Sequence, residues 1–152
     1  DLTVYENMRF YGGIYGMTKK DIMNRIDYFL HKLDLEDIRN KQVKGIPLGW
    51  RQKLAFCVAI LHDPPLVFLD EPTSGVDPVT RRQFWNMIYE TAYKGTTVFI
   101  TTHYMDEAEY CTRVSIMKEG EIKALDKPKE LKRKFGAENM NQVFLNIAGR
   151  NR

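Results

Sequence analysis

Two short segments, one an unbroken apolar run and the other β-branched, constrain the fold of this chain more than any other feature. Residues 66–69 read Leu-Val-Phe-Leu, and residues 97–101 read Thr-Val-Phe-Ile-Thr. Runs without polar alternation are typical of strands that are covered on both faces. The segment between them begins as a helix at Asp77-Pro78 and has a helix stop at Gly95. Because strand, helix and strand follow one another, we expect an α/β fold with a parallel sheet.

Helical patterns fill the part of the chain before the first strand. Thr3 and Glu6 have the spacing of a capping box and predict a helix to about Tyr15, and Thr18 with Asp21 repeats the spacing. Residues 48–61 carry a further apolar stripe, which Pro64-Pro65 ends. The stripe consists of Trp50, Leu54, Cys57, Val58 and Leu61. We expect a helical subdomain over residues 1–62, with a polar connector at 34–45.

The second half of the chain is predicted to alternate strands and helices. We divide it into residues 63–125, the C-terminal part of an α/β core, and residues 126–152, C-terminal helices. The expected elements are a helix at 105–111, strands at 113–117 and 121–124, a helix from Asp126 to Gly136, and a last helix before Gly149.

Composition excludes several classes of protein. The 152 residues are 43% hydrophobic and 28% charged, as in a soluble globular protein with a buried core. The formal net charge of +3 is too small to argue for nucleic-acid binding by itself. The longest apolar run, residues 54–61, is far shorter than the roughly 20 residues of a membrane-spanning helix, and no signal-peptide pattern is present. Cys57 and Cys111 have no disulfide or zinc spacing, and we expect buried free thiols.

Two carboxylates follow the first predicted strand directly. Ligands bind at the carboxyl ends of the strands of a parallel sheet. Asp70 would emerge there, where a carboxylate can hold Mg²⁺ directly or through water. Glu71 could polarise an attacking water molecule as a general base. The alternative is a strand that merely meets an acidic turn.

A loop and a histidine add to this predicted site. Residues 72–78 read Pro-Thr-Ser-Gly-Val-Asp-Pro, which fixes a tight loop before a helix, although a plain connection has the same composition. His103 ends the second predicted strand, where an imidazole beside the carboxylates can contact a phosphate oxygen. His31 and His62 have no such setting, and we take them as surface or helix-end residues.

These features, in this order, closely resemble the ATPases of ATP-binding cassette (ABC) transporters. The final stretch of the chain resembles the C-terminal helix of cassettes that serve drug and other export permeases, which indicates the export and multidrug type. Residues 66–70 match the family's Walker B strand, Glu71 its catalytic glutamate and His103 its switch histidine. Ser74 to Asp77 match its D-loop. Residues 118–122 resemble the hairpin that follows, and residues 1–7 resemble the segment after the glutamine loop.

The resemblance implies a partial P-loop NTPase cassette with a parallel sheet core and an N-terminal helical subdomain. It implies ATP and Mg²⁺ as cofactors, with Asp70 organising Mg²⁺, Glu71 deprotonating water and His103 holding the γ-phosphate. Gly49, Ser74 and Asp77 would take part in nucleotide binding between two cassettes. The implied partners are a second cassette and transmembrane permease subunits, which the helix near residues 5–15 would touch, with no nucleic acid. The implied location is peripheral, on the cytoplasmic side of a membrane.

The chain departs from the family at the signature sequence, which is Leu-Ser-Gly-Gly-Gln. Residues 46–50 here read Ile-Pro-Leu-Gly-Trp, so that only Gly49 is retained. Pro47 has neither the hydroxyl nor the N–H that a serine would offer to the partner's ATP. The helix N-terminus behind it still favours an anion. We therefore expect the contact across the cassette pair to be weakened or rearranged.

A larger departure is that no G-x-x-x-x-G-K-[ST] sequence occurs in the 152 residues. That loop would supply N–H groups and a lysine to the phosphates. We therefore expect this chain to be the C-terminal part of a longer ATPase, inactive by itself and exposing a sheet edge. One alternative is a non-catalytic cassette that acts as an assembly or regulatory module. Another is a DNA-repair or chromosome-associated ATPase, although no long heptad pattern is present.

Overall fold

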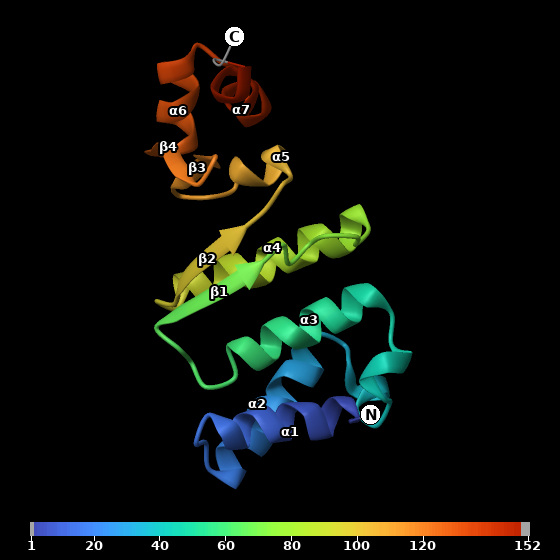
Figure 1. Ribbon diagram of the computed structural model, residues 1–152. Coiled ribbons are helices and arrows are strands. Elements are labelled where there is room, and N and C mark those ends of the chain that lie inside the picture. Colours follow the sequence, from blue (N-terminus) through green and yellow to red (C-terminus); the bar gives the residue numbers. More distant parts are fainter. Residues whose placement is uncertain (1, 150–152) are drawn as a thin grey trace. The chain divides into compact units, whose positions relative to one another are not determined.

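The computed structural model describes residues 2–149 (Figure 1). The chain divides into two compact units, the N-terminal unit Asp1–Thr101 and the C-terminal unit Thr102–Arg152. The sequence-based division at residues 62 and 125 stays a prediction. Among the residues that the structure describes, no helix is long and apolar enough to cross a membrane.

The first two helices begin at the residues that the capping patterns predict. Helix α1 (Val4–Ile14) starts behind Thr3, whose hydroxyl accepts from the N–H of Glu6 at 3.2 Å while Glu6 Oε2 accepts from the N–H of Thr3 at 2.8 Å. Helix α2 (Lys19–Lys32) starts behind Thr18, whose hydroxyl accepts from the N–H of Asp21. These bonds satisfy N–H groups that have no partner inside a helix.

The predicted polar connector is an ordered part of the N-terminal unit. It contains two 3₁₀ turns, η1 (Glu36–Ile38) and η2 (Val43–Gly45). Its backbone carbonyls at Arg39 and Lys41 accept from the first N–H groups of α1 at 3.0 Å. Leu35 and Ile38 are buried. The segment therefore secures the start of α1 rather than acting as a flexible linker.

Helix α3 (Leu48–Ala59) carries the predicted apolar stripe. Leu54, Cys57, Val58 and Leu61 are buried, while Trp50 is half-buried. The helix ends two residues before the predicted Leu61. Arg25 on α2 binds the residues that follow this end, since its guanidinium donates to the carbonyl oxygens of Ile60 and Leu61 at 3.0 Å. Those carbonyls have no partner further along the helix.

A parallel strand pair forms the α/β part of the N-terminal unit. Strand β1 (Leu66–Asp70) pairs in register with β2 (Thr97–Thr101), from Leu66 opposite Thr97 to Asp70 opposite Thr101. Helix α4 (Pro78–Tyr93) connects them and lies beside them (Figure 1). The predicted strand-helix-strand order is confirmed, and the helix stop at Gly95 has a positive φ of 102°.

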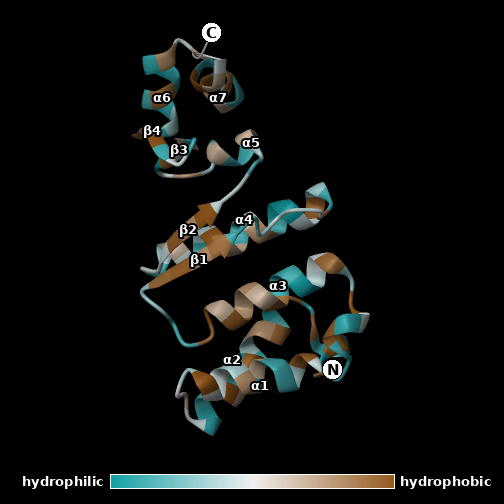
Figure 2. Ribbon diagram, in the orientation of Figure 1, coloured by the Kyte–Doolittle hydropathy of each residue, from teal (hydrophilic) through white to brown (hydrophobic). Residues whose placement is uncertain are grey.

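The expectation that both strands are covered on both faces is wrong for the described residues. Val67 and Leu69 are buried, but Leu66, Phe68 and Phe99 expose 44%, 69% and 53% of their surface. Figure 2 shows the strands largely in the brown of hydrophobic residues. The uniform apolar sequence thus gives the strand pair two apolar faces, and one of these faces is exposed to solvent in this structure. We call Leu66, Phe68 and Phe99 the open sheet face.

The C-terminal unit contains short elements around a separate core. Its elements are helix α5 (Met105–Ala108), strands β3 (Val114–Lys118) and β4 (Glu121–Asp126), and helices α6 (Pro128–Phe135) and α7 (Met140–Gly149). The strands form the predicted antiparallel hairpin. Helix α5 is shorter than predicted, and α6 has Lys127 rather than Asp126 at its N-cap. The buried core consists of Ala108, Ile116, Ala124, Leu131, Met140, Val143 and Ile147.

Candidate functional site

Three residues meet at the carboxyl ends of the parallel strands, and we call them the acidic edge: Asp70, Glu71 and Thr101. Asp70 ends β1 and lies opposite Thr101, the last residue of β2. The Thr101 hydroxyl donates to Asp70 Oδ1. The N–H of Glu71 donates to the hydroxyl and to the carbonyl oxygen of Thr101, each at 3.1 Å. Both acidic residues are exposed, so their carboxylates are accessible to a ligand.

The backbone changes direction sharply at Glu71. Its φ of 43° lies in the left-handed region, which residues with a side chain rarely adopt. Its carbonyl oxygen then accepts from the N–H of Ser74 at 3.1 Å, which closes a turn. Such a conformation persists only where surrounding bonds hold it, and it clusters at functional sites. The turn thus fixes where the predicted catalytic glutamate leaves the sheet.

The predicted loop after the carboxylates packs on the start of α3. Pro72 and Thr73 are buried and Ser74 is half-buried. Gly75 has a φ of 73°, and a Cβ atom on it would lie 3.2 Å from Leu48 Cδ2. The loop therefore needs glycine for its conformation.

Asp77 is the N-cap of α4, as predicted. Its Oδ1 accepts from the N–H groups of Val79 and Thr80 at 3.0 and 2.9 Å, and its Oδ2 accepts from the Thr80 hydroxyl at 2.5 Å. The hydroxyl and N–H of Thr80, together with the N–H of Val79, hold the pKa of Asp77 below its usual value, against a smaller opposing effect of desolvation. The carboxylate is thus bound to its own helix in this conformation.

Gly49 lies at the junction of α3 and α4. A Cβ atom on Gly49 would be 2.8 Å from Thr80 Cγ2. The structure therefore brings Gly49, the loop of Ser74 and the cap of Asp77 into one neighbourhood. Pro47 precedes α3 as its N-cap and makes no side-chain capping bond. The first turn of α3 thus has no such bond, which agrees with the predicted loss of the signature serine's hydroxyl.

His103 belongs to the C-terminal unit, two residues after Thr101. It is exposed, and its ring lies 4.2 Å from that of Tyr104 between centroids. The residue before His103 is held by a buried acid, because Glu107 Oε2 accepts from the Thr102 hydroxyl at 2.8 Å. That His103 lies beside the carboxylates stays a prediction from its position after β2.

The acidic edge fits a magnesium ion that arrives with a nucleotide. Within residues 2–149, no group of three or more His, Cys, Asp or Glu side chains is arranged to hold a metal ion. Mg²⁺ commonly takes one or two carboxylates and completes its shell with phosphate oxygens and water. Asp70 offers such a carboxylate, exposed at the edge of the sheet. A single exposed carboxylate of this kind fits Mg²⁺ that is also bound by phosphate oxygens.

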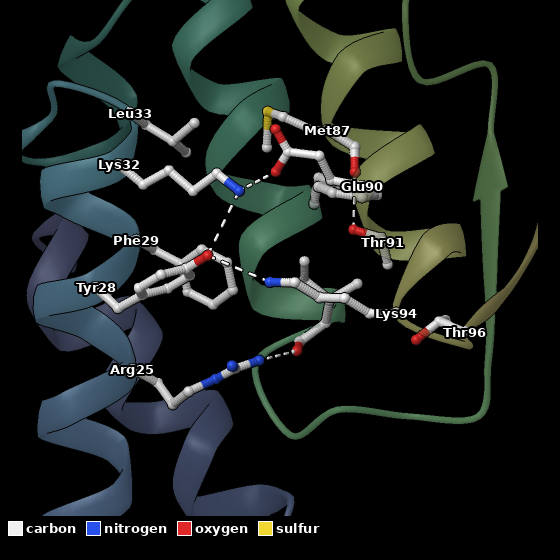
Figure 3. A pocket seen from close by; sticks show the side chains of 12 residues that line it. Arg25, Tyr28, Phe29, Lys32, Leu33, Met87, Glu90, Thr91, Lys94 and Thr96 are labelled. Carbon is white, nitrogen blue, oxygen red and sulfur yellow. Dashed lines mark hydrogen bonds and ion pairs between the residues drawn. The ribbon is translucent and has the colours of Figure 1, made fainter.

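A second polar cluster joins α2 to α4 in the same unit (Figure 3). Tyr28 accepts from the ammonium groups of Lys32 and Lys94 at 3.4 and 3.3 Å, and Lys32 pairs with Glu90. Burial pushes the pKa of Tyr28 up, but the hydrogen bonds from Lys94 and Lys32 outweigh it, so the pKa is lowered. The pocket here has a volume of about 40 Å³ and includes no acidic-edge residue. Its side chains bind one another, which indicates a structural connection.

Sequence reasoning missed Thr80 and Thr101. Both are small hydroxyl residues. The Thr80 hydroxyl binds the N-cap Asp77 of its own helix, and the Thr101 hydroxyl binds Asp70 on the neighbouring strand. Thr80 could have been found, because it stands three residues after the N-cap Asp77, where a second capping bond forms. Thr101 could not, since its partner Asp70 is set by strand register.

Comparison with known proteins identifies the family. A family model described as "AAA domain, putative AbiEii toxin, Type IV TA system" matches residues 13–105, more than half of the chain. The chain is 40% identical over 152 residues to "Probable multidrug ABC transporter ATP-binding protein YbhF" of Escherichia coli K12. That match covers 97% of this chain and 26% of YbhF, so the chain spans about a quarter of that relative's length.

Solved structures agree with the sequence relatives. One described as "Structure of ATP binding subunit of ABC transporter" has a TM-score of 0.86 at 26% identity and covers 97% of this chain and 63% of that one. The structure of cbiO1 from Clostridium perfringens, part of the ABC transporter complex cbiONQ, has a TM-score of 0.74 at 27% identity and covers 88% and 54%. The predicted α/β cassette fold is thereby confirmed. This chain therefore belongs to the AAA-domain family, and its relatives in sequence and structure are ATP-binding proteins of ABC transporters.

Proposed function

We propose that this chain forms the Walker B part of an ATPase that drives an ABC transporter, with the phosphate-binding loop supplied by residues outside these 152. The observation that carries the proposal is the acidic edge, where Asp70 and Glu71 leave a parallel strand pair beside Thr101. The 40% identity to YbhF and the fold match to an ATP-binding subunit support it.

The chemistry assigns a separate task to each side chain. Asp70 binds the magnesium ion that accompanies ATP, directly or through water. Bound Mg²⁺ would neutralise charge on the phosphate oxygens during phosphoryl transfer. Glu71 accepts the proton of the attacking water as a general base. His103 donates a hydrogen bond to the γ-phosphate and loses it when the phosphate leaves.

A second cassette would complete the site. In the proposed pair, each ATP lies between the phosphate loop of one cassette and the Gly49 region of the other, around a two-fold axis. Ser74 and Asp77 lie in the loop that packs on the start of α3, through Gly75 and Leu48. A movement of that loop would therefore displace Leu48 and its neighbour Gly49. With Pro47 in place of the family's serine, the anion contact rests on the N-terminus of α3.

Membrane subunits are the second proposed class of partner. Helix α1 presents exposed apolar and aromatic residues along one stretch, with Phe10 and Ile14 exposing 56% and 61% of their surface. Contiguous apolar surface of this kind marks protein contacts. The place of cbiO1 in a transporter complex supports a permease as the partner, and the multidrug description of YbhF supports export. The chain would then act at the cytoplasmic side of a membrane, without nucleic acid.

Substitution of Glu71 by Gln tests the proposal, in the protein that carries this chain together with a phosphate loop. We expect ATP turnover to fall by roughly 10²-fold or more, because Gln keeps the shape of Glu but accepts no proton. Glu119→Gln, in the exposed turn of the β3–β4 hairpin, is the matched control and should leave turnover unchanged. Equal turnover of the Glu71→Gln protein and the wild type would contradict the proposal.

The non-catalytic module remains the second candidate, because these 152 residues contain no phosphate-binding loop of their own. A module that only binds a permease or a complete cassette makes no use of Glu71 as a base. In that case neither the wild type nor the Glu71→Gln protein would hydrolyse ATP, while both would still bind the transporter. Measuring turnover and complex formation on the same two samples separates the candidates.

A further inference from the structure

We propose that Thr101 is a positioning residue for ATP hydrolysis, which holds the Asp70 carboxylate and the Glu71 backbone in their working arrangement. This inference rests on the proposed function and adds a residue to it.

The Thr101 hydroxyl uses both of its hydrogen-bonding capacities at the acidic edge. It donates its proton to Asp70 Oδ1 and accepts from the N–H of Glu71 at 3.1 Å. A threonine hydroxyl has one proton to donate, and here that proton goes to the carboxylate. Strand β1 fixes Asp70 and the following turn fixes Glu71. The Thr101 hydroxyl therefore links two consecutive residues that have different roles in the proposed mechanism.

The bond to Asp70 sets the direction of its carboxylate. A hydrogen bond to an ionised group is stronger than one between neutral groups. With Oδ1 engaged by Thr101, the Oδ2 atom is the one presented to a cation or to a metal-bound water molecule. Groups that orient a metal-binding carboxylate in this way typically change metal affinity or activity by about 10- to 100-fold when they are removed.

The bonds to Glu71 hold a backbone conformation that is unfavourable by itself. Glu71 has a φ of 43°, and its N–H is shared between the hydroxyl and the carbonyl oxygen of Thr101. Removing the hydroxyl takes away one of the two Thr101 acceptors of this N–H. We expect the turn to loosen, so that the Glu71 carboxylate is held less firmly over its water molecule.

The same strand offers a matched control. Thr97, Phe99 and Thr101 alternate along β2 and therefore share one face. Thr97 stands at the opposite end of the strand, opposite Leu66. Replacing either threonine with valine makes the same chemical change in the same strand, but only Thr101 faces the carboxylates.

The experiment compares Thr101→Val, Thr101→Ser and Thr97→Val in the full-length protein that carries this chain. Valine removes the hydroxyl and keeps the branched shape that a strand favours, whereas serine keeps the hydroxyl. The readouts are kcat and KM for ATP, and the affinity for Mn²⁺ in the presence of ATP, measured by electron paramagnetic resonance. Thermal unfolding checks the fold, and Thr101→Ala replaces the valine variant if the latter does not fold.

We expect Thr101→Val to lower kcat about 10- to 100-fold and to weaken Mn²⁺ binding, with a smaller change in KM. Thr101→Ser should restore both, and Thr97→Val should resemble the wild type. The inference is overturned if Thr101→Val matches the wild type, or if Thr101→Ser is as impaired as Thr101→Val. The proposed function itself still stands, whatever the Thr101 variants do, if the wild type hydrolyses ATP and the Glu71→Gln variant does not. A wild type without ATP turnover would overturn both.

Discussion

Gly49 on α3 lies so close to Thr80 on α4 that a Cβ atom at position 49 would be 2.8 Å from Thr80 Cγ2. Real Cβ atoms are essentially never found so near a heavy atom. Thr80 in turn holds Asp77 through its hydroxyl. The glycine that survives from the family's signature sequence is therefore required by packing in this chain, whatever it does for a nucleotide.

Replacing Gly49 with Ala should destabilise the protein. Alanine in a helix is ordinarily favoured over glycine by about 0.5–1 kcal/mol. Overpacking of a close contact costs about 1–3 kcal/mol, which outweighs that gain. Urea unfolding should show a lower midpoint for Gly49→Ala. The control is Gly13→Ala on α1, where nothing lies within 4 Å of an added Cβ atom and a higher midpoint is expected. A stabilised Gly49→Ala protein would show that the contact is not tight.

Asp77 should contribute to stability in a pH-dependent way. Its pKa is lowered in the folded protein from the usual 3.8, chiefly by the Thr80 hydroxyl and N–H. A carboxyl whose folded pKa is depressed stabilises the fold above its unfolded pKa, and the effect disappears as the pH falls through the folded pKa. The difference in urea-unfolding midpoint between the wild type and Asp77→Ala should thus be constant above pH 5. It should become smaller below pH 4, as the carboxylate of Asp77 is protonated. A difference that persists unchanged at pH 2 would contradict the cap.

Cys57 should be unreactive in the folded protein, because it is buried as expected, whereas Cys111 is only half-buried and corrects the expectation of two buried thiols. Burial raises the pKa of Cys57 to about 12, and burial with the nearby Glu107 charge raises that of Cys111. Only the thiolate reacts with alkylating reagents. At pH 8, iodoacetamide should leave Cys57 unmodified for as long as the protein stays folded, while urea should make both cysteines reactive. Mass spectrometry of the peptides measures this, and rapid labelling of native Cys57 would contradict its burial.

The open sheet face should make the 152-residue chain self-associate when it is produced alone. Leu66, Phe68 and Phe99 form neighbouring exposed apolar groups on β1 and β2, which make a two-stranded sheet within residues 2–149. Phe68→Ser should reduce association in sedimentation velocity. Tyr93→Ser, which removes an aromatic residue that is 94% exposed on α4, should not. A monomeric chain with a sharp, high melting temperature would count against this account.

Local signals in the sequence predicted much of this fold. The starts of α1, α2 and α4 follow from Thr3, Thr18 and Asp77, because a cap acts on N–H groups within three residues. Asp70 and Glu71 were predicted at the end of a strand because they directly follow the apolar run of residues 66–69, which is also a local signal. What depends on distant residues was harder to predict. Arg25 reaches from α2 to the carbonyl oxygen that follows α3, and Thr101 meets Asp70 only through strand register.

The coverage of the strands shows the same limit. The sequences of β1 and β2 indicate that both faces of the strand pair are apolar. They do not indicate which segment of the chain covers each face. In the described residues, one face packs inside the N-terminal unit and the other exposes Phe68 and Phe99. The position of His103 relative to the carboxylates likewise depends on how the chain continues after β2, and it stays a prediction.

The central claim is that the acidic edge cleaves ATP, and the nucleotide that remains bound tests it most directly. The protein that carries this chain with its phosphate loop would be incubated with Mg²⁺ and ATP, freed of unbound nucleotide and analysed by chromatography. The account predicts mainly ADP on the wild type and mainly ATP on Glu71→Gln, because binding survives and the general base is lost. The same proportion of ADP on both proteins would contradict the role of Glu71.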